Sequence, residues 1–314
     1  MLFMMPIPDK FFGIIIYSIY IYTHRLQMKY NIIDENLVTD IYNSYIAHRN
    51  RNKLNPKIGR PPTIDVKHVI RIMFKILKGN RMEDLIDDLT KLSSYEKIGR
   101  DIRRFGLLNN IMKNKLVDAN LAGLIDTSSV HIDSSLSINK CGEQEVKYSY
   151  KFKNKKGTSI HLSLSNNYLP VGVHIKSANV PDVVQLEKTM DNIMIPLSSS
   201  NKKPVYINAD TGYNSLNNFN LIENKYKLKM LCPVKKNAKM KHPHNKTLFN
   251  RMKRKHNQIR YTGRLKIERF FATVKSFAKI NMRTDKLAEV FLGSIKFVLL
   301  NIIYKTIQKI IDIV

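Results

Sequence analysis

The hydrophobic pattern of the chain changes its period at Gly123. Before that residue, apolar side chains recur at the spacing of a helix face, as Ile64, Val69, Met73 and Leu77 do. After it, apolar and polar residues alternate over short segments that are separated by turn residues, which is the pattern of strands. The chain is therefore expected to fold as a helical region followed by a region built on a sheet.

The helical region is expected to cover residues 28–121. A Gly-Arg-Pro-Pro-Thr segment at 59–63 predicts a break, with Thr63 as the N-cap of the next helix and Gly79 as its end. A later helix is predicted over 95–117, and it carries three neighbouring arginines: Arg100, Arg103 and Arg104. Short helices that end in an arginine-bearing helix resemble a helix-turn-helix DNA-binding unit. A plain helical bundle with ordinary surface arginines fits the same sequence equally well.

The remaining region, residues 122–314, is expected to contain five strands. They are predicted at 123–135, 158–165, 169–177, 204–210 and 229–234. The first three follow one another directly and predict a meander. Helices predicted from Pro181 and over 215–225 separate the later strands. This order indicates an α/β fold, with a mixed sheet flanked by helices.

A helix predicted over 261–275 places polar side chains on one stripe. At ~100° per residue, Arg264, Glu268 and Lys275 fall within about 40° of one another, with Tyr261 at the edge. Most of the apolar side chains point the other way: Ile267, Phe270, Val274 and Phe277. Such a helix would bury its apolar face and hold a carboxylate between two cations on the other, which indicates a site.

The charge of the chain narrows the class of partner. It contains 53 Lys and Arg against 25 Asp and Glu, a formal net charge of +28, which favours a polyanionic partner. From Asn224 to Ile267 there is no acidic residue and there are fifteen basic ones. The densest run contains Arg251, Lys253, Arg254 and Lys255. A solvated basic loop is the ordinary interpretation, but contact with a nucleic-acid backbone is favoured because the run leads directly to Glu268.

Three carboxylates are expected to lie near one another. Asp133 is predicted at the end of the first strand, Asp210 at the end of the fourth, and Glu268 on the later helix. Sites in α/β folds gather at strand ends. Carboxylates suit Mg²⁺ or Mn²⁺, and a pair of such ions serves phosphoryl transfer on nucleic acids. Each acid alone could equally be a cap or a surface charge, so their joint placement carries the interpretation.

Three motifs in the expected order resemble those of the DDE transposases of prokaryotic insertion sequences. The first is IDSSLSINKCGEQE at 132–145, followed by a basic Lys-Lys-Gly and a strand. The second is NADTGYNS at 208–215. The third is the most specific, because the four residues of the 261–275 helix reproduce the family's Y-x2-R-x3-E-x6-K signature. The resemblance covers about residues 125–300, and the segment 59–77 also looks like the N-terminal region of these enzymes.

The resemblance implies an RNase H-like catalytic domain that cuts DNA at transposon ends and then joins the freed 3′-hydroxyl to target DNA. It implies that two Mg²⁺ or Mn²⁺ ions are held by Asp133, Asp210 and Glu268. Arg264 and Lys275 would then contact DNA near the scissile phosphate, with Tyr261 in support. The implied partners are double-stranded DNA, as inverted repeats and target, and a second copy of the chain in a homodimer on the DNA.

The first acid and the activity each have an alternative. Asp126 lies seven residues before Asp133 in a similar Ile-Asp-x-Ser-Ser context, so it is the alternative first acid, although Asn139 then leaves the expected register. The adjacent Ser134 and Ser135 are interpreted as strand residues and not as nucleophiles. The activity also has alternatives: an inactive or repurposed DNA-binding protein, or a nuclease of the same fold.

Other features exclude classes of protein. Cys141 and Cys232 form no disulfide framework, and His242 and His244 have no cysteine partners for zinc. No phosphate-binding GxxxxGK[ST] motif is present. The expected compartment is the one that holds the DNA: the cytoplasm of a prokaryote, at the nucleoid, or the nucleus or viral factory of a eukaryotic or viral host.

Two apolar segments do not predict a membrane protein. The first lies in an N-terminal extension, residues 1–27, whose apolar run at 11–22 is too short to span a bilayer; the working start could be Met28. The second is a C-terminal helix that is interrupted by three lysines: Lys296, Lys305 and Lys309. A core or oligomer helix is expected there, and no membrane partner.

Overall fold

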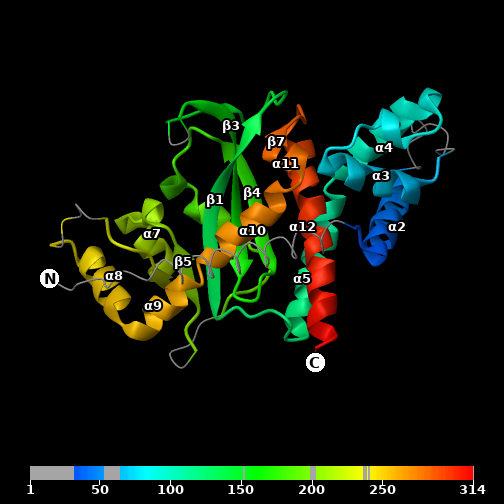
Figure 1. Cartoon of the computed structure of the whole chain (residues 1–314). Coiled ribbons are helices and arrows are strands. Elements are labelled where there is room, and N and C mark those ends of the chain that lie inside the picture. Colours follow the sequence, from blue (N-terminus) through cyan, green and yellow to red (C-terminus); the bar gives the residue numbers. More distant parts are fainter. Residues whose placement is uncertain are drawn as a thin grey trace, which may run out of the picture.

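The structure is a computed structural model, and it describes residues 32–52, 64–150, 153–198, 203–235, 239 and 241–313. The predicted N-terminal extension and the predicted break at 59–63 lie outside the described residues. The described chain has a helical region at one end, a mixed sheet in the middle and a group of helices at the other end (Figure 1).

The described part of the helical region contains four α-helices: α2 (Glu35–Asn52), α3 (Val66–Lys78), α4 (Leu92–Arg104) and α5 (Leu107–Leu121). The predicted end of α3 is confirmed, since Gly79 adopts a left-handed conformation with φ 118°. Its predicted N-cap, Thr63, was wrong. The cap is Asp65, because its carboxylate lies directly before the helix and accepts a hydrogen bond from the amide of Lys67 at 2.9 Å.

The single helix predicted over 95–117 is divided into α4 and α5. Gly106 has φ 70°, a conformation that a helix interior does not allow and that glycine adopts at little cost. The apolar pattern continues across this break, which is why periodicity alone did not reveal it. The helical part of the fold is confirmed, whereas the helix-turn-helix function stays a prediction.

The sheet is mixed and flanked by helices, as expected. Its central strands are ordered β4–β3–β1–β5–β6: β4 (Pro170–Ser177), β3 (Lys155–Ser165), β1 (Ser129–Asn139), β5 (Tyr206–Ala209) and β6 (Lys229–Leu231). The first three are antiparallel, and β1, β5 and β6 are parallel. Two short strands were not predicted, β2 (Lys147–Ser149) on β3 and β7 (Met282–Arg283) on β1, because three or two residues show no alternation.

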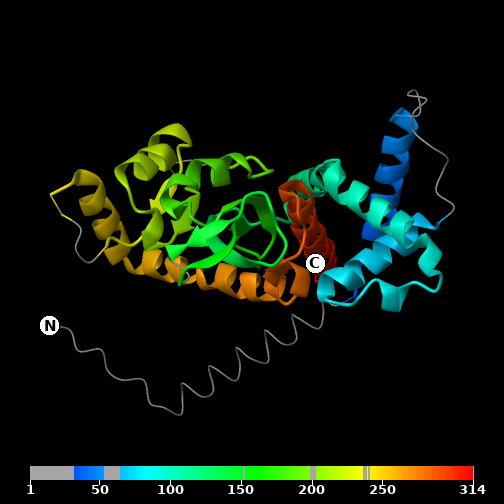
Figure 2. The same ribbon diagram turned by 90° about the horizontal axis from the view of Figure 1, so that it is seen from above.

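Helices cover both faces of the sheet (Figure 2). One face carries α6 (Leu186–Asp191) and α7 (Leu216–Asn220). The other carries α9 (Lys255–Thr262), α10 (Leu265–Lys275) and α11 (Ala278–Asn281), which run end to end along the sheet. The basic helix α8 (Pro243–Lys253) precedes α9 at the end of the molecule away from α2 to α4 (Figure 1).

The last helix, α12 (Ala288–Ile311), connects the helical region to the sheet. It packs against α4, α5 and β4. Gly293 permits the close approach of α4, because a Cβ atom there would lie 2.2 Å from the carbonyl oxygen of Arg103. By length and composition α12 could cross a membrane, but 78% of its most apolar stretch is buried inside the described fold. It packs as a core helix.

Candidate active site

The register between β1 and β5 brings two of the three predicted acids together. Ile132 of β1 pairs with Ala209 of β5 in the parallel ladder. The residue after Ile132 is Asp133, and the residue after Ala209 is Asp210. Neighbouring strands of a sheet lie about 4.8 Å apart. Asp210 follows the last residue of β5, as predicted. The sheet therefore places the two acids side by side at the point where β5 ends.

Asp133 itself does not lie at a strand end, so that part of the prediction was wrong. β1 continues to Asn139, six residues further, because it pairs with β3 and then with β7 beyond the end of β5. The predicted start was also too early, since β1 begins at Ser129. The two acids thus lie beside the middle of β1, at the level where the shorter neighbouring strand β5 ends.

The third acid comes from α10. The helix predicted over 261–275 is two helices, because α9 ends at Thr262 and α10 begins at Leu265. Glu268 lies in the first turn of α10. The predicted apolar face is confirmed, since all four of its residues are buried: Ile267, Phe270, Val274 and Phe277. Their burial fixes the rotation of α10 and directs Glu268 away from the core.

Arg264 joins two of the acids. Its Nη1 donates to Oδ2 of Asp133 at 3.2 Å, and its Nη2 donates to Oε1 of Glu268 at 2.6 Å. The side chains of Arg264 and Asp133 are each 17% exposed, whereas that of Glu268 is 47% exposed. Burial opposes the charge of Arg264, but Tyr261 and the carboxylates, including Asp210, outweigh it and raise the pKa of the guanidinium group.

Tyr261 and Lys275 are placed differently. The Tyr261 hydroxyl donates to the carbonyl oxygen of Ala209 at 3.4 Å, so it connects α9 to the end of β5, and its burial raises its pKa. Lys275 is at the far end of α10, where burial lowers its pKa. Within the described residues, no hydrogen bond or ion pair links Lys275 to the three acids. The structure thus assembles Tyr261, Arg264 and the acids but leaves Lys275 apart.

The donor chemistry fits a hard divalent cation. Carboxylate oxygens are the preferred ligands of Mg²⁺ and Mn²⁺. In the described part of the chain, however, no three His, Cys, Asp or Glu side chains are grouped closely enough to hold an ion. The positive charge between Asp133 and Glu268 is supplied by Arg264. An ion shared by these acids would have to replace the guanidinium group there.

A fourth acid lies near the site and was missed by the sequence analysis. Asp182 accepts a hydrogen bond from the Ser134 hydroxyl at 2.6 Å, next to Asp133 in the chain. Tyr213 is buried nearby, and burial together with the charges of Asp182, Asp133 and Asp210 raises its pKa well above the usual value. The segment that begins at Pro181 was interpreted only as the start of a helix. Nothing in its sequence indicated that Asp182 would lie near the other acids.

The alternative first acid has a different environment. Asp126 lies before β1, where its carboxylate accepts hydrogen bonds from the Ser128 amide at 2.9 Å and from the Asn166 amide group at 2.6 Å. These contacts hold the loop before β1 to the turn after β3. The structure therefore places Asp133, and not Asp126, beside Asp210 and Arg264.

The cations predicted to contact DNA fall into two groups. Three arginines are in ion pairs within the chain: Arg103 with Asp285 at 3.0 Å, Arg104 with Glu289 at 2.5 Å, and Arg251 with Glu223 at 2.6 Å. Four others are exposed: Arg100, Lys253, Arg254 and Lys255. All seven assignments to DNA stay predictions, and the geometry favours the exposed group.

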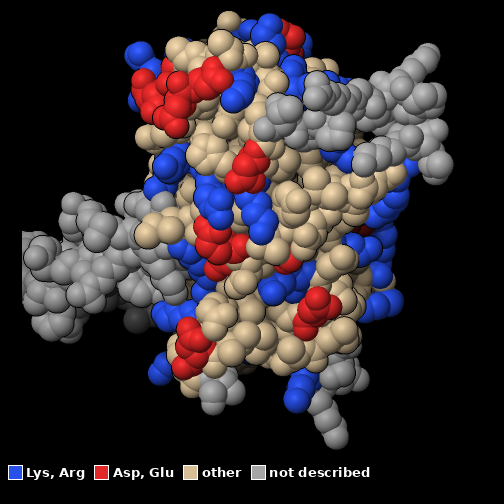
Figure 3. Space-filling view, turned by 90° about the vertical axis from the view of Figure 1, so that its right-hand side faces the viewer, with Lys and Arg blue, Asp and Glu red and all other residues tan. Residues whose placement is uncertain are grey.

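The surface charge supports the same distinction. On the side of the molecule that carries α2 to α4, lysine and arginine side chains are interspersed with acidic ones (Figure 3). The segment 224–267 at the other end contains no acidic residue. The segment that forms α8 and α9 is therefore free of acidic residues of its own, although Arg251 in it pairs with Glu223.

Comparison with known proteins shows the family of the chain. The model of a family described as the transposase DDE domain matches residues 120–302, more than half of the chain, and the chain belongs to that family. Among solved structures, it is similar to a cryo-EM structure of the piggyBac transposase synaptic complex with hairpin DNA. The TM-score is 0.45 and the identity 13%, over 92% of this chain and 75% of that one. That likeness is too distant to carry an argument about function. No curated protein matches the chain.

Proposed function

We propose that the chain cuts DNA at the ends of a transposon and joins the freed 3′-hydroxyl groups to target DNA. The observation that carries the proposal is that Arg264 contacts both Asp133 and Glu268, with Asp210 beside Asp133 in the sheet, in a chain of the transposase DDE family. Both steps are phosphoryl transfers, so one set of acids could serve them in turn.

The three acids would hold two divalent ions, Mg²⁺ or Mn²⁺. When bound, these ions would activate the attacking water or 3′-hydroxyl and stabilise the leaving oxygen. Glu268 is the most exposed member of the pair that Arg264 joins, and it lies on a helix whose buried face holds it in position. Asp133 and Asp210 are fixed by the β1–β5 register.

The basic residues would position the DNA. Arg264, once released from Asp133 and Glu268, would reach the scissile phosphate from within the site. Tyr261 holds the end of β5 through Ala209 and so keeps Asp210 in place. Lys275 and the exposed cations of α8 and α9 would contact the DNA backbone further away.

Two copies of the chain are proposed to act together on the DNA, because a transposon has two ends and each copy contains one set of acids. The proposed compartment is the one that holds the host DNA. The test of the whole proposal is metal-dependent nicking of DNA that carries the gene's own flanking inverted repeats. Ends with a 3′-hydroxyl should then be joined to a target plasmid, whereas 3′-deoxy ends should not.

The substitution Arg264→Gln should have opposite effects on metal binding and on catalysis. Arg264→Gln removes the cation that competes for Asp133 and Glu268, so the half-saturating Mn²⁺ concentration is expected to fall by about tenfold, roughly 1.4 kcal/mol. Nicking should fall on the order of 10²-fold, because the phosphate loses a preorganised charge. Mn²⁺ binding can be followed by electron paramagnetic resonance without DNA. Unchanged or weaker Mn²⁺ binding would show that Arg264 does not occupy the cation position.

A further inference from the structure

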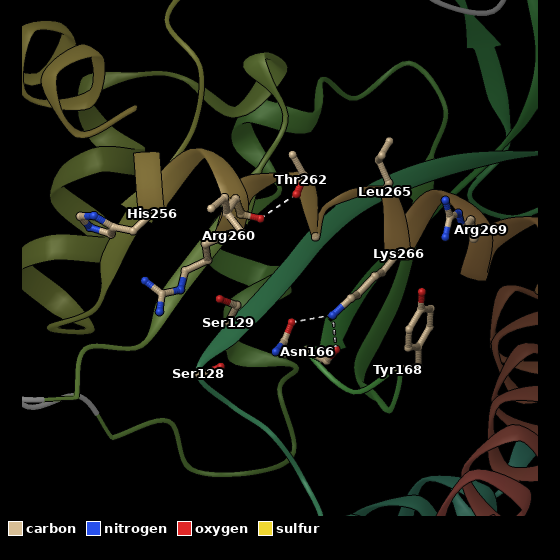
Figure 4. A pocket seen from close by; sticks show the side chains of 12 residues that line it. Ser128, Ser129, Asn166, Tyr168, His256, Arg260, Thr262, Leu265, Lys266 and Arg269 are labelled. Atoms are coloured by element: carbon tan, nitrogen blue, oxygen red, sulfur yellow. Dashed lines mark hydrogen bonds between the residues drawn. The ribbon is translucent and has the colours of Figure 1, made fainter. Parts of the chain in front are cut away.

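A polar cavity lies on the same face of the sheet as the acids but apart from them. It has a volume of about 530 Å³, between the α9–α10 turn, the start of β1 and the turn after β3 (Figure 4). Its lining includes Ser129, Asn166, Arg260, Lys266 and Arg269. The lining residues do not include Asp133, Asp210 or Glu268.

The charge of this cavity is positive. Arg260 stacks over the ring of Tyr206 at 4.2 Å, and the Lys266 ammonium donates to the carbonyl oxygen and Oδ1 of Asn166 at 2.7 and 2.8 Å. Within the described chain, neither these two cations nor Arg269 forms an ion pair. The nearby acid is Asp126, which lies behind Asn166 and is bonded to its amide group. Three cations without acidic partners would attract an anion.

An unused hydrogen-bond donor lies beneath the cavity. His131 is fully buried, and its Nδ1 lies 3.0 Å from Nδ2 of Asn208. That amide nitrogen also donates to the carbonyl oxygen of Arg260 at 3.2 Å, so it is the donor and Nδ1 is the acceptor. The ring proton is therefore on Nε2, which is buried and makes no hydrogen bond of good geometry in the described structure, although the Asn166 side chain lies close enough to raise the pKa of the ring.

Gly263 separates this histidine from the cavity. A Cβ atom at position 263 would lie 2.9 Å from Cε1 and 3.4 Å from Nε2 of His131, and Gly263 itself lines the cavity. A buried donor without an acceptor costs about 1–3 kcal/mol. Cations on the wall and a buried N–H group beneath the floor both suit an anionic oxygen.

We infer that this cavity binds a backbone phosphate of the DNA, away from the phosphate that is cut. The inference rests on the proposed function, which brings DNA to α10. Ser129 lines the cavity and lies four residues before Asp133 on β1, about 13 Å along the strand. The phosphate held there would therefore lie within a few nucleotides of the cut.

The test is the salt dependence of DNA binding, measured in EDTA so that no cleavage is required. Arg269→Gln and Arg260→Gln are each expected to weaken binding to repeat-end DNA by about tenfold. Each should also reduce the slope of log K against log salt by about one, as for one lost phosphate contact. The matched control is Lys188→Gln, which removes the same charge from α6 on the opposite face of the sheet and should leave affinity and slope unchanged.

A second measurement locates the phosphate. DNA with a single neutral methylphosphonate should bind the wild-type chain less tightly when the substitution lies at one position within a few nucleotides of the cut. Arg269→Gln should no longer respond to that substitution. Equal salt slopes for all variants, or no sensitive position in this range, would overturn the inference. The inference would also be overturned if inorganic phosphate bound to the wild-type chain at constant ionic strength while Arg269→Gln bound DNA normally. The cavity would then take free phosphate only.

These outcomes are independent of the catalytic proposal. A wild-type chain that never nicks DNA, but whose cavity variants lose slope, would retain the phosphate site and lose the proposed chemistry. A chain that nicks normally while the cavity variants bind like wild type would retain the chemistry and lose the site. Circular dichroism of each variant should match the wild type, which excludes misfolding as the cause.

Discussion

The substitution Asp133→Asn is expected to reduce metal-dependent nicking on the order of 10³-fold. The substitution keeps the shape of the side chain but removes the negative charge that a divalent ion needs. It also removes one partner of Arg264, whose other partner, Glu268, remains. DNA binding should be retained, because binding depends on cations that lie elsewhere. Nicking is measured on inverted-repeat DNA in Mg²⁺, and binding is measured in EDTA.

Two matched variants make this prediction specific. Asp126→Asn is expected to keep nicking within about tenfold and to lower stability by about 1 kcal/mol, because Asp126 only joins Ser128 and Asn166. Glu289→Gln, in a half-exposed ion pair with Arg104, should change nicking by less than about twofold. Loss of nicking in Asp126→Asn with activity retained in Asp133→Asn would identify Asp126 as the first acid.

The substitution Arg283→Met is expected to lower the free energy of unfolding by about 3–5 kcal/mol. Arg283 is fully buried, and its guanidinium group donates to four acceptors: the carbonyl oxygens of Gln144, Asp285 and Lys286, and the Thr158 hydroxyl. Methionine fills much of the volume but removes all four hydrogen bonds in a site closed to water, and only the Lys286 carbonyl oxygen keeps another donor, the Glu143 amide. Urea unfolding, followed by circular dichroism, measures the loss.

The control for this prediction is an exposed arginine. Arg71 pairs with Glu35 at 2.7 Å, but their side chains are 39% and 64% exposed. Arg71→Met should therefore cost less than about 1 kcal/mol. Comparable losses for the two variants would mean that the buried hydrogen bonds of Arg283 contribute no more than a surface ion pair.

The sequence predicted the sheet and the acids because both depend on local pattern. Alternation located the five principal strands, and the observed β1–β5 register then places Asp133 and Asp210 side by side. The Tyr-Arg-Glu-Lys spacing located Glu268 because the apolar residues between its members fix the rotation of α10. Strand ends were less accurate, since β1 extends as far as its partners β3 and β7 permit.

What the sequence did not predict depends on contacts between distant segments. The net charge could not show which cations are neutralised inside the fold, and the partners of Arg103 and Arg251 are Asp285 and Glu223, distant in the chain. Asp182 reaches Ser134 only because the sheet and the turn before α6 meet. The break between α9 and α10 at Gly263 is hidden because the polar stripe continues across it.

Nicking of DNA that carries the gene's own inverted repeats, with the wild-type chain compared with Glu268→Gln, tests the central claim most directly. We expect Mg²⁺-dependent cleavage at the repeat ends by the wild type, and its loss, on the order of 10³-fold, in a variant that still binds the DNA. Cleavage without dependence on the repeat ends would indicate a nuclease of the same fold. Strong DNA binding with no cleavage by either protein, at any Mg²⁺ or Mn²⁺ concentration, would contradict the proposal.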